Sequence, residues 1–359
     1  MPLAVAGGAV RDLLLGAPVR DVDLVVEGDA PAFARRLGRR LRAPARSHPR
    51  FGTATLDLGD GSRLDVAASR RETYARPGAL PSVSPAPLAE DAARRDFTVN
   101  AMLLRLAPGP VRLLDPHGGR RDLAARRIRM LHRRSPHDDP TRAYRAVRYA
   151  NRLGFRIDAA TRRWIREALD AGAFDRISAD RRRREIERLF SEPHAGRAAA
   201  LLSRLGLLAA IHPALAADPR IRRGLAQAER RGVRSWFAVL LILASEMTET
   251  QAGELARRLN LRRAGARTLR RWPRRLRSAP DGSETPDERA ARAALAGGRG
   301  TAFSGQLRIA GRDLVRAGIA PGPAIGRALE AARSARRERR IRPSQELAFA
   351  VAHARGEGE

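Results

Sequence analysis

The chain has 359 residues, and 70 basic against 39 acidic side chains give it a formal net charge of +31. It contains no cysteine, which excludes disulfides, thiolate nucleophiles and cysteine metal ligands. Its longest apolar run, Trp236 to Ala244, is too short to span a bilayer, so we expect no membrane partner and a cytoplasmic location. Every lysine-or-arginine position is arginine, and this preference partly reflects a bias in composition. The excess of positive over negative charge still attracts polyanions, and nucleic acid is the leading candidate.

The first part of the chain, residues 1–132, reads as a mixed α/β domain. Alternating and apolar runs predict strands, and a 3.6-residue period predicts one short helix. Prolines and a glycine exclude helix or central strand over Arg76 to Pro87 and favour a long loop. The predicted elements are a strand over Leu3–Ala6, a helix over Val10–Leu15, a strand over Asp21–Val26, and a hairpin of Thr53–Leu58 with Arg63–Ala67 around Gly59-Asp60-Gly61.

Helical patterns dominate from Pro140 onward, and strand signals nearly vanish. The stretch from Leu255 to Pro280 holds ten arginines and no acidic residue. Residues 278–288 are polar and contain two prolines, which predicts a linker, and a last helical unit follows over about 289–355.

The first motif that carries chemistry is GGAVRDLLLG followed by RDVDLVV. Gly7 and Gly8 stand between a predicted strand and helix, where backbone amides can approach a phosphate, and Arg11 can reach the same anion. Asp21 and Asp23 are two residues apart on a strand, so both carboxylates project from one face and attract a hard divalent cation such as Mg²⁺. A glycine turn beside an exposed strand face is the plainer alternative for each motif taken alone.

The second motif is RRDFTVNAM, Arg94 to Met102. Asp96 and Thr98 are suited to cap a helix running to Met102. Arg95 lies beside that cap and can reach a phosphate or sugar, or it is simply a solvated surface charge.

The third motif is DDPTRAYRAVRYANRLGF. At 100° per residue, one stripe of the predicted helix is basic, and Ala143, Ala146, Val147 and Ala150 form the opposite packing face. Asp139 at the head of the basic stripe offers acceptors beside donors, a combination that can match the Watson–Crick edge of a base. A solvated basic face is the alternative. The basic stripe comprises Arg142, Arg145, Arg148 and Arg152.

The fourth motif, Ile309 to Leu329, contains glycines between two predicted helices. The turn over Gly318 to Gly326 can present amides to a backbone phosphate, or it is a plain helix–turn–helix connection.

Together, GGAVRDLLLG, DVD, RRDFTVNAM, LLDPHGG, DDPTRAYRAVRYANRLGF and GIAPGPAIG resemble the bacterial class II tRNA nucleotidyltransferases. That family includes CCA-adding enzymes, their CC- and A-adding relatives and bacterial poly(A) polymerases. The resemblance implies an α+β fold: a nucleotidyltransferase head with a polymerase-β-like mixed sheet (1–132), then an all-helical neck (133–200), body (201–280) and tRNA-binding tail (281–359). It also implies CCA addition to the tRNA 3′ end from CTP and ATP, with Mg²⁺ as cofactor.

The same resemblance implies roles for individual residues. Asp21 and Asp23 would bind Mg²⁺ and carry catalysis, and Asp65 would match a third acidic position. The residues implied to bind the nucleotide are Gly8, Arg11 and Arg95 around the triphosphate, Asp139 and Arg142 as a protein template for the base, and Arg145 and Arg148 in support.

One position departs from the family pattern, and the resemblance leaves open which nucleotides the protein adds. The family has Glu-Asp-Pro where this chain has Asp138-Asp139-Pro140, so the carboxylate of Asp138 has a shorter reach. The segment after Tyr74 occupies the place of the family's flexible loop, and its presence favours an enzyme that adds A. The alternatives are a poly(A) polymerase, an A-adding or CC-adding enzyme, and, from another class, a catalytically silent RNA-binding module.

Overall fold

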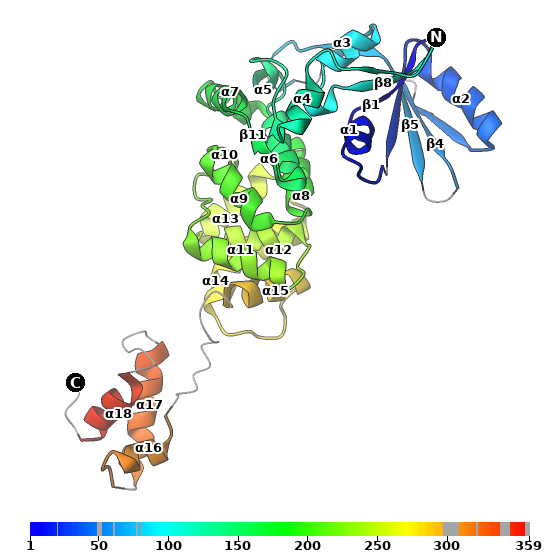
Figure 1. Ribbon diagram of the computed structural model, residues 1–359. Coiled ribbons are helices and arrows are strands. Elements are labelled where there is room, and N and C mark those ends of the chain that lie inside the picture. The colour runs from blue at the N-terminus through cyan, green and yellow to red at the C-terminus, as the bar shows by residue number, and fades with distance from the viewer. Residues whose placement is uncertain are drawn as a thin grey trace. The chain divides into compact units, whose positions relative to one another are not determined.

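The computed structural model describes residues 1–19, 21–48, 52–59, 62–76, 78–79, 81–296, 309–320, 322–337 and 345–355. The chain forms two compact units, Met1–Leu295 and Ala296–Glu359 (Figure 1). The larger unit begins with a mixed sheet and continues as a stack of helices, and the smaller unit is helical. This confirms the predicted α+β fold.

The head is built on a mixed seven-stranded sheet, with a separate two-stranded sheet beside it. Its strands are β1 (Leu3–Ala6), β2 (Val22–Val26), β3 (Ala45–His48), β4 (Thr53–Asp57), β5 (Arg63–Ala68), β6 (Arg70–Thr73), β7 (Ser82–Pro85), β8 (Leu103–Ala107) and β9 (Arg112–Leu114). The large sheet has the order β3-β4-β5-β2-β1-β8-β9, and β6 pairs with β7 in the small one. Only the β2–β5 pair within the large sheet is parallel among the described strands.

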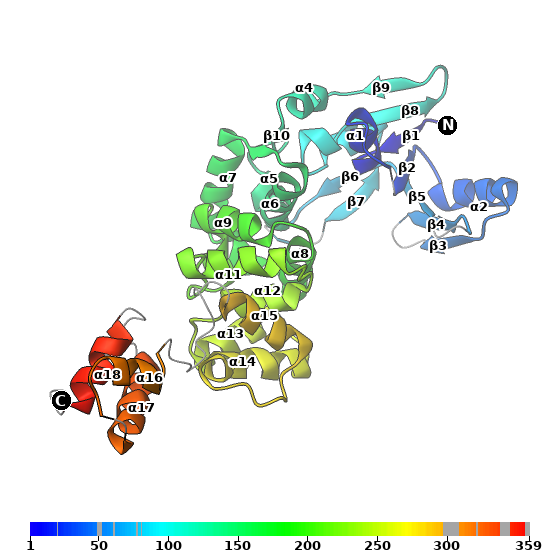
Figure 2. The same ribbon diagram turned by 60° about the horizontal axis from the view of Figure 1, so that its bottom comes forward.

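Both faces of the central strand β2 are covered, which explains its wholly apolar end. Leu24 and Val26 pack in one core with helix α2 (Ala30–Leu41), which Figure 2 shows lying along β3 to β5. Val25 points to the opposite core, which it shares with helix α3 (Leu88–Ala93). Because side chains alternate along a strand, Asp23 lies on the same face as Val25, away from α2.

Most head elements agree with the sequence, with one correction. The strands over 3–6 and 22–26, the short helix α1 (Gly8–Leu14) and the antiparallel β4–β5 hairpin are confirmed, although Asp60 and Gly61 lie outside the described residues. The predicted loop over Arg76–Pro87 is wrong for residues 82–85, which form strand β7 against β6. Pro85 is the last residue of β7, and prolines are tolerated on edge strands such as those of a two-stranded sheet. Pro77 lies outside the described residues.

The neck and the body are helical and share one hydrophobic core. Two short strands, β10 (Arg127–Ile128) and β11 (Arg156–Ile157), pair in parallel where the head meets the neck. The core is continuous from Val10 and Phe97 through the neck helices to Trp272 and Leu295. The helices are α4 (Gly119–Ala124), α5 (Ser135–Asp138), α6 (Thr141–Leu153), α7 (Ala159–Asp170), α8 (Ala179–Phe190), α9 (Ala195–Arg204), α10 (Leu207–Ile211), α11 (Pro219–Arg230), α12 (Trp236–Leu243), α13 (Glu249–Arg258), α14 (Arg263–Arg277) and α15 (Pro286–Ala296).

The boundary between the two compact units falls later than the predicted start of the tail at residue 281. Helix α15 belongs to the larger unit, since Ala291, Ala294 and Leu295 are buried in its core. The guanidinium of Arg292 also lies 5.9 Å from the ring centroid of Trp272 on α14. The polar segment over 278–285 is therefore a connection inside the body rather than a linker between units.

In the smaller unit, the described residues form three helices that pack around a small core of their own. These are α16 (Gly311–Arg316), α17 (Pro323–Arg337) and α18 (Glu346–Ala354), and the buried residues include Leu314, Ala328 and Ala350. The predicted helix–turn–helix connection is present between α16 and α17, with Gly318 at a positive φ of 87°, while Pro321 lies outside the described residues. Nowhere in the described chain is a helix both long and apolar enough to cross a membrane.

Candidate active site

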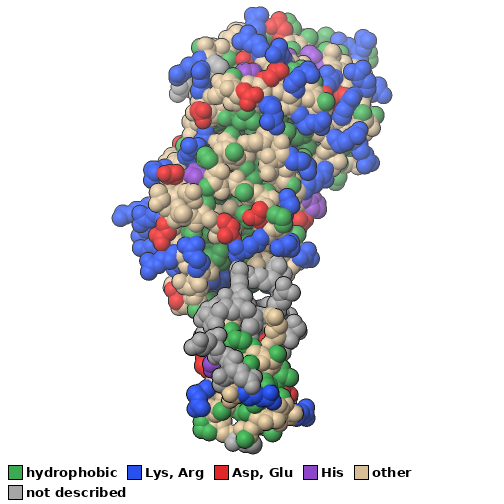
Figure 3. Space-filling model, turned by 90° about the vertical axis from the view of Figure 1, so that its left-hand side faces the viewer, with side chains coloured by type: hydrophobic (Ala, Val, Ile, Leu, Met, Phe, Trp, Pro, Cys, Tyr) green, Lys and Arg blue, Asp and Glu red, His purple; other side chains and the backbone are tan. Residues whose placement is uncertain are grey.

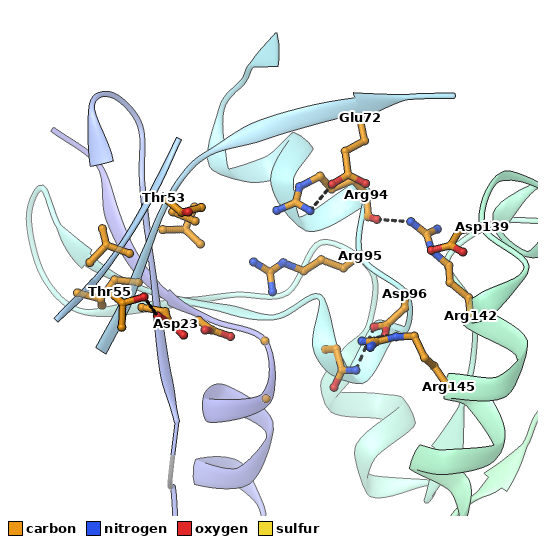
Figure 4. A pocket seen from close by; sticks show the side chains of 18 of the residues that line it. Asp23, Thr53, Thr55, Glu72, Arg94, Arg95, Asp96, Asp139, Arg142 and Arg145 are labelled. Atoms are coloured by element: carbon orange, nitrogen blue, oxygen red, sulfur yellow. Dashed lines mark hydrogen bonds and ion pairs between the residues drawn. The ribbon is translucent and has the colours of Figure 1, made fainter. Parts of the chain in front are cut away.

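A cavity of about 590 Å³ lies between the head sheet and the neck helix α6 (Figure 4). The head contributes a carboxylate face and a group of arginines, and α6 with the residue before it contributes further polar side chains. The polar and glycine residues that line it are Gly7, Gly8, Asp23, Thr53, Thr55, Asp65, Glu72, Arg94, Arg95, Asp96, Asn100, Asp139, Arg142 and Arg145, together with the aromatic Tyr74 and Tyr149.

Two carboxylates face the cavity from neighbouring strands. Asp23 on β2 is in register with Asp65 on the parallel strand β5, so both side chains lie on one face of the sheet. The hydroxyl of Thr55 donates to Asp65 Oδ1 at 2.6 Å and orients it. Burial raises the pKa of Asp23, and the charges of Asp65 and Asp21 raise it further, while that of Arg95 lowers it. Negative charge therefore accumulates at this point.

Asp21 lies one residue before β2 and is not part of the cavity lining that the structure describes. The side chains of Asp21, Asp23 and Asp65 are all exposed, which leaves them accessible to a ligand. The described chain holds no group of three or more acidic, histidine or cysteine side chains arranged around a metal position. The carboxylate oxygens of Asp23 and Asp65 are nevertheless of the chemical type that a hard divalent cation prefers.

The glycine turn before α1 makes room for an arginine. A Cβ atom on Gly7 would lie 2.8 Å from Nη1 of Arg95, and the φ of Gly7 is +70°. Arg95 is held by Asp91, whose buried carboxylate accepts from it at 2.9 Å and also from Arg94 at 2.7 Å. Burial alone would raise the pKa of Asp91, but these two arginines hold it below its usual value. Gly7 thus allows the Arg95 side chain to lie over the turn and point into the cavity (Figure 4).

Asp96 binds an arginine of the neck and does not cap a helix, so that prediction is wrong. Its Oδ2 accepts from Nε and Nη2 of Arg145 at 2.8 and 2.6 Å, and its Oδ1 accepts from the side chain of Asn100. The Thr98 hydroxyl donates to Asp122, and the segment forms only a 3₁₀ turn over Thr98–Asn100. The buried carboxylate is matched to a guanidinium that comes from a distant part of the chain.

Asp139 and Arg142 both line the cavity opposite the carboxylates of the sheet. Oδ1 of Asp139 accepts from the backbone and hydroxyl of Thr141 at 3.0 and 2.6 Å and from Arg181 at 2.8 Å. Arg142 is buried and donates to the Ser135 hydroxyl and to the Arg94 carbonyl, each at 2.8 Å. The predicted template residues are therefore brought to one wall of the cavity and held by separate partners.

Arg11 and Arg148 lie behind the cavity lining. Arg11 is 3% exposed and donates to Asn100 at 2.7 Å and to Asp12 at 2.8 Å, and Arg148 pairs with Glu185 at 3.5 Å and with Glu192. Within the predicted basic stripe, Arg142 and Arg148 are buried and Arg145 is half-buried, while Arg152 is exposed. The guanidiniums of Arg11, Arg145, Arg148 and Arg152 lie 5.3, 5.6, 5.3 and 5.7 Å from the ring centroid of Tyr149.

Several residues at the cavity were missed by the sequence analysis. Tyr74 donates to Glu72 at 2.9 Å, Glu72 accepts from Arg94 at 2.8 Å, and burial raises the pKa of Tyr74. The polar RRETY stretch before the proline-rich segment was the available signal for Glu72 and Tyr74. Nothing local marks Tyr149, which lines the cavity, or Arg181, which contacts the cavity residue Asp139 from outside the lining, because their partners come from distant segments.

A mixed sheet with carboxylates on adjacent strands, a Gly-Gly turn under an arginine, and a helical wall of polar side chains define a nucleotidyltransferase. A family model described as "Poly A polymerase head domain" matches residues 3–129, and one described as "Probable RNA and SrmB- binding site of polymerase A" matches residues 154–218. The chain is 36% identical to the CC-adding tRNA nucleotidyltransferase of Deinococcus radiodurans over 96% of its own length and 87% of that protein's. The chain belongs to the tRNA nucleotidyltransferase family.

Other relatives have names that describe different products. The A-adding tRNA nucleotidyltransferase of Geobacter sulfurreducens is 40% identical over 70% of this chain, but the chain spans only 28% of that longer protein. Among solved structures, "Thermotoga maritima CCA-adding enzyme complexed with tRNA_CCA" has a TM-score of 0.68 at 28% identity and covers 98% of this chain and 91% of that one. Relatives of this family therefore bear A-adding, CC-adding and CCA-adding names.

Proposed function

We propose that this protein adds CCA to the 3′ end of tRNA from CTP and ATP without a nucleic-acid template. One observation carries the proposal: a single cavity has the Asp23 and Asp65 carboxylates on its sheet wall and Asp139 with Arg142 on its helical wall. The first pair suits phosphoryl transfer, and the second suits selection of a base. Because the proposed substrate is tRNA, we place the activity in the cytoplasm.

In the reaction, the tRNA 3′ hydroxyl attacks the α-phosphorus of the bound nucleotide, a new phosphodiester bond forms, and pyrophosphate leaves. Asp21 and Asp23 would hold Mg²⁺, with Asp65 beside them. The ion would supply charge neutralisation on the phosphates and acidify the attacking hydroxyl. The carboxylates and arginines of the chain position the reactants, which accounts for most of the catalytic effect in such transfers.

The arginines and glycines near the Gly-Gly turn suit the triphosphate. Gly8 and Arg95 line the cavity directly, and we assign them to the phosphates and the sugar. Arg145 lines it as well, and Asp96 fixes its direction. Arg11 and Arg148 do not line the cavity, and we assign them a supporting role through their contacts with the ring of Tyr149, which does line it.

Tyr149 provides a test of this arrangement. Replacing Tyr149 with Leu removes the ring on which Arg11 and Arg145 lie, so we expect the KM for both CTP and ATP to rise about tenfold, since each cation–π contact contributes roughly 0.5–2 kcal/mol. Tyr149→Phe keeps the ring and should stay within about twofold of the unchanged protein. Steady-state kinetics on both nucleotides measures this, and equal kinetics for the Leu and Phe variants would contradict the role.

Base selection is assigned to Asp139 and Arg142. Cytosine and adenine each present an exocyclic amine donor beside a ring-nitrogen acceptor, and uracil and guanine present the reverse. An acceptor on Asp139 and a donor on Arg142 match the first pattern and leave buried groups unpaired against the second, which makes rejection strong.

The arginine-rich helices suit the RNA backbone. Arginine side chains are spread over the face of the larger unit drawn in Figure 3, and helix α14 carries arginines along its exposed side. Duplex RNA is recognised through shape and phosphate contacts rather than sequence, and such binding weakens steeply with salt.

The test uses three tRNA substrates, ending in the discriminator base, in -C and in -CC, with CTP and ATP offered separately. We expect C to be added to the first two and A to the third. An enzyme that adds only C is the second candidate, because the relative matched over nearly the whole chain bears the name CC-adding. Addition of A to the -CC substrate would exclude it. Addition of A alone would identify an A-adding enzyme or poly(A) polymerase, and no addition at all would indicate an RNA-binding module.

A further inference from the structure

Within the part of the chain that the structure describes, the hydrogen bonds to the Asp139 carboxylate all involve one of its two oxygens. All three described hydrogen bonds to its side chain, from Thr141 N, Thr141 Oγ1 and Arg181 Nη2, end on Oδ1. No described residue donates to Oδ2, although the side chain lines the cavity. The arrangement therefore orients the carboxylate so that Oδ2 is available to a ligand.

Arg181 is the partner that comes from outside the local turn. Thr141 is two residues from Asp139, so its bonds form with the start of α6 itself, whereas Arg181 reaches across from helix α8. The Arg181 side chain is 24% exposed and does not line the cavity, so it acts on the ligand only through Asp139.

The guanidinium of Arg181 is itself fixed by a second acceptor. Its Nη1 donates to the carbonyl of Gly78 at 3.0 Å, while its Nη2 donates to Asp139. Gly78 in turn lies close to the neck: its amide donates to the Asp138 carbonyl at 3.3 Å, and a Cβ on it would lie 3.1 Å from the Arg176 carbonyl oxygen. A planar guanidinium can bridge two acceptors in this way, and a lysine ammonium on a flexible stem reproduces such a bridge poorly.

We propose that Arg181 is a positioning residue for base selection: by bridging Asp139 Oδ1 and the Gly78 carbonyl, it reserves Asp139 Oδ2 for the exocyclic amine of cytosine or adenine. This inference rests on the proposed function. Without the bridge, Asp139 keeps its bonds to Thr141 but gains rotational freedom about its side-chain torsions. A carboxylate that can rotate no longer holds its acceptor oxygen in one place. The free-energy difference between binding a matching base and binding uracil or guanine therefore becomes smaller.

The experiment compares Arg181→Met with the unchanged protein by measuring kcat/KM for CTP, UTP, ATP and GTP on the matching tRNA substrates. We expect the CTP-to-UTP and ATP-to-GTP ratios to fall about tenfold, because selectivity of this kind depends on paired buried polar groups. Arg181→Lys should give ratios between those of the Met variant and the unchanged protein. The matched control is Arg184→Met, on the exposed side of the same helix, which should leave both ratios unchanged.

The outcomes separate the inference from the proposed function. If the unchanged protein adds no nucleotide to tRNA, the proposed function fails. If it does so and the Met and Lys variants both keep the original ratios, the role of Arg181 is refuted. A general loss of stability would lower all four kcat/KM values together and leave the ratios intact, which also counts against the proposal. Should the Met variant not fold, Arg181→Gln and the Lys variant provide the same ratios.

Discussion

Replacing Asp23 with Asn should reduce nucleotide addition by roughly 1,000-fold or more while leaving the fold intact. Asp23 is the carboxylate that faces the cavity from the centre of the sheet, beside Asp65. Loss of its charge would remove one proposed ligand of the divalent cation. Such an ion contributes several kcal/mol to reactions of this kind, and each 1.36 kcal/mol corresponds to about tenfold in rate. Single-turnover incorporation of CTP on tRNA measures the effect.

The same Asp23→Asn substitution should not lower the stability of the fold, although it lowers the activity. The pKa of Asp23 is raised by burial and by its acidic neighbours, so the ionised side chain disfavours the folded state at neutral pH. The Asn variant removes that repulsion, and its Tm should be equal to or above that of the unchanged protein. The control is Asp57→Asn, an exposed carboxylate on the same sheet outside the cavity, which should keep full activity. Activity of the Asp23 variant within tenfold of normal would exclude the catalytic role.

Replacing Asp96 with Ala should produce the largest loss of stability in the head and neck, about 3–5 kcal/mol. The substitution leaves the guanidinium of Arg145 in a largely enclosed position without its carboxylate, and it also frees the Asn100 side chain that holds Arg11. Urea denaturation measures the change. Glu167→Ala breaks an exposed pair with Arg133 and should cost less than about 1 kcal/mol. A similar small cost for the Asp96 variant would contradict the argument.

The ion pair of Asp96 with Arg145 should also make the stability of the protein depend on pH. Burial alone would raise the pKa of Asp96, but Arg145 and the hydrogen bonds to the carboxylate hold it below its usual value. A carboxylate with a depressed folded-state pKa stabilises the fold fully above its unfolded pKa, near 3.9, and this contribution is lost as the pH falls through the folded value. The stability difference between the unchanged protein and the Ala variant should therefore shrink in acid below about pH 4.

Local patterns predicted the residues whose positions depend on near neighbours in the chain. The two-residue period of a strand placed Asp23 on one face of β2, and the 100° helical period separated the arginines of α6 from Ala143, Ala146 and Val147, all of which are buried. These periodicities are properties of the backbone, so they hold whatever packs against the element.

Contacts between distant segments were beyond the same reasoning. The alignment of Asp65 with Asp23 depends on a parallel strand pairing, and the pairing of Asp96 with Arg145 depends on how the neck meets the head. Arg142 and Arg148 sit on the predicted basic stripe but are buried, because Ser135, Glu185 and Glu192 supply partners from elsewhere. The segment over 278–285 has the composition of a linker, and only the buried alanines of α15 show that the body continues past it.

The continuous core of neck and body restricts how this enzyme can be recombined with its relatives. A chimera that exchanged residues 133–200 alone would join apolar surfaces evolved for different partners, leaving voids and clashes throughout an interior that extends to Leu295. A cut near residue 295 would leave that interior whole, whereas a cut near residue 132 would separate Phe97, Met102 and Met130 of the head from the neck residues they pack with. Head, neck and body up to residue 295 are thus the smallest part of the chain that can be exchanged without dividing this core.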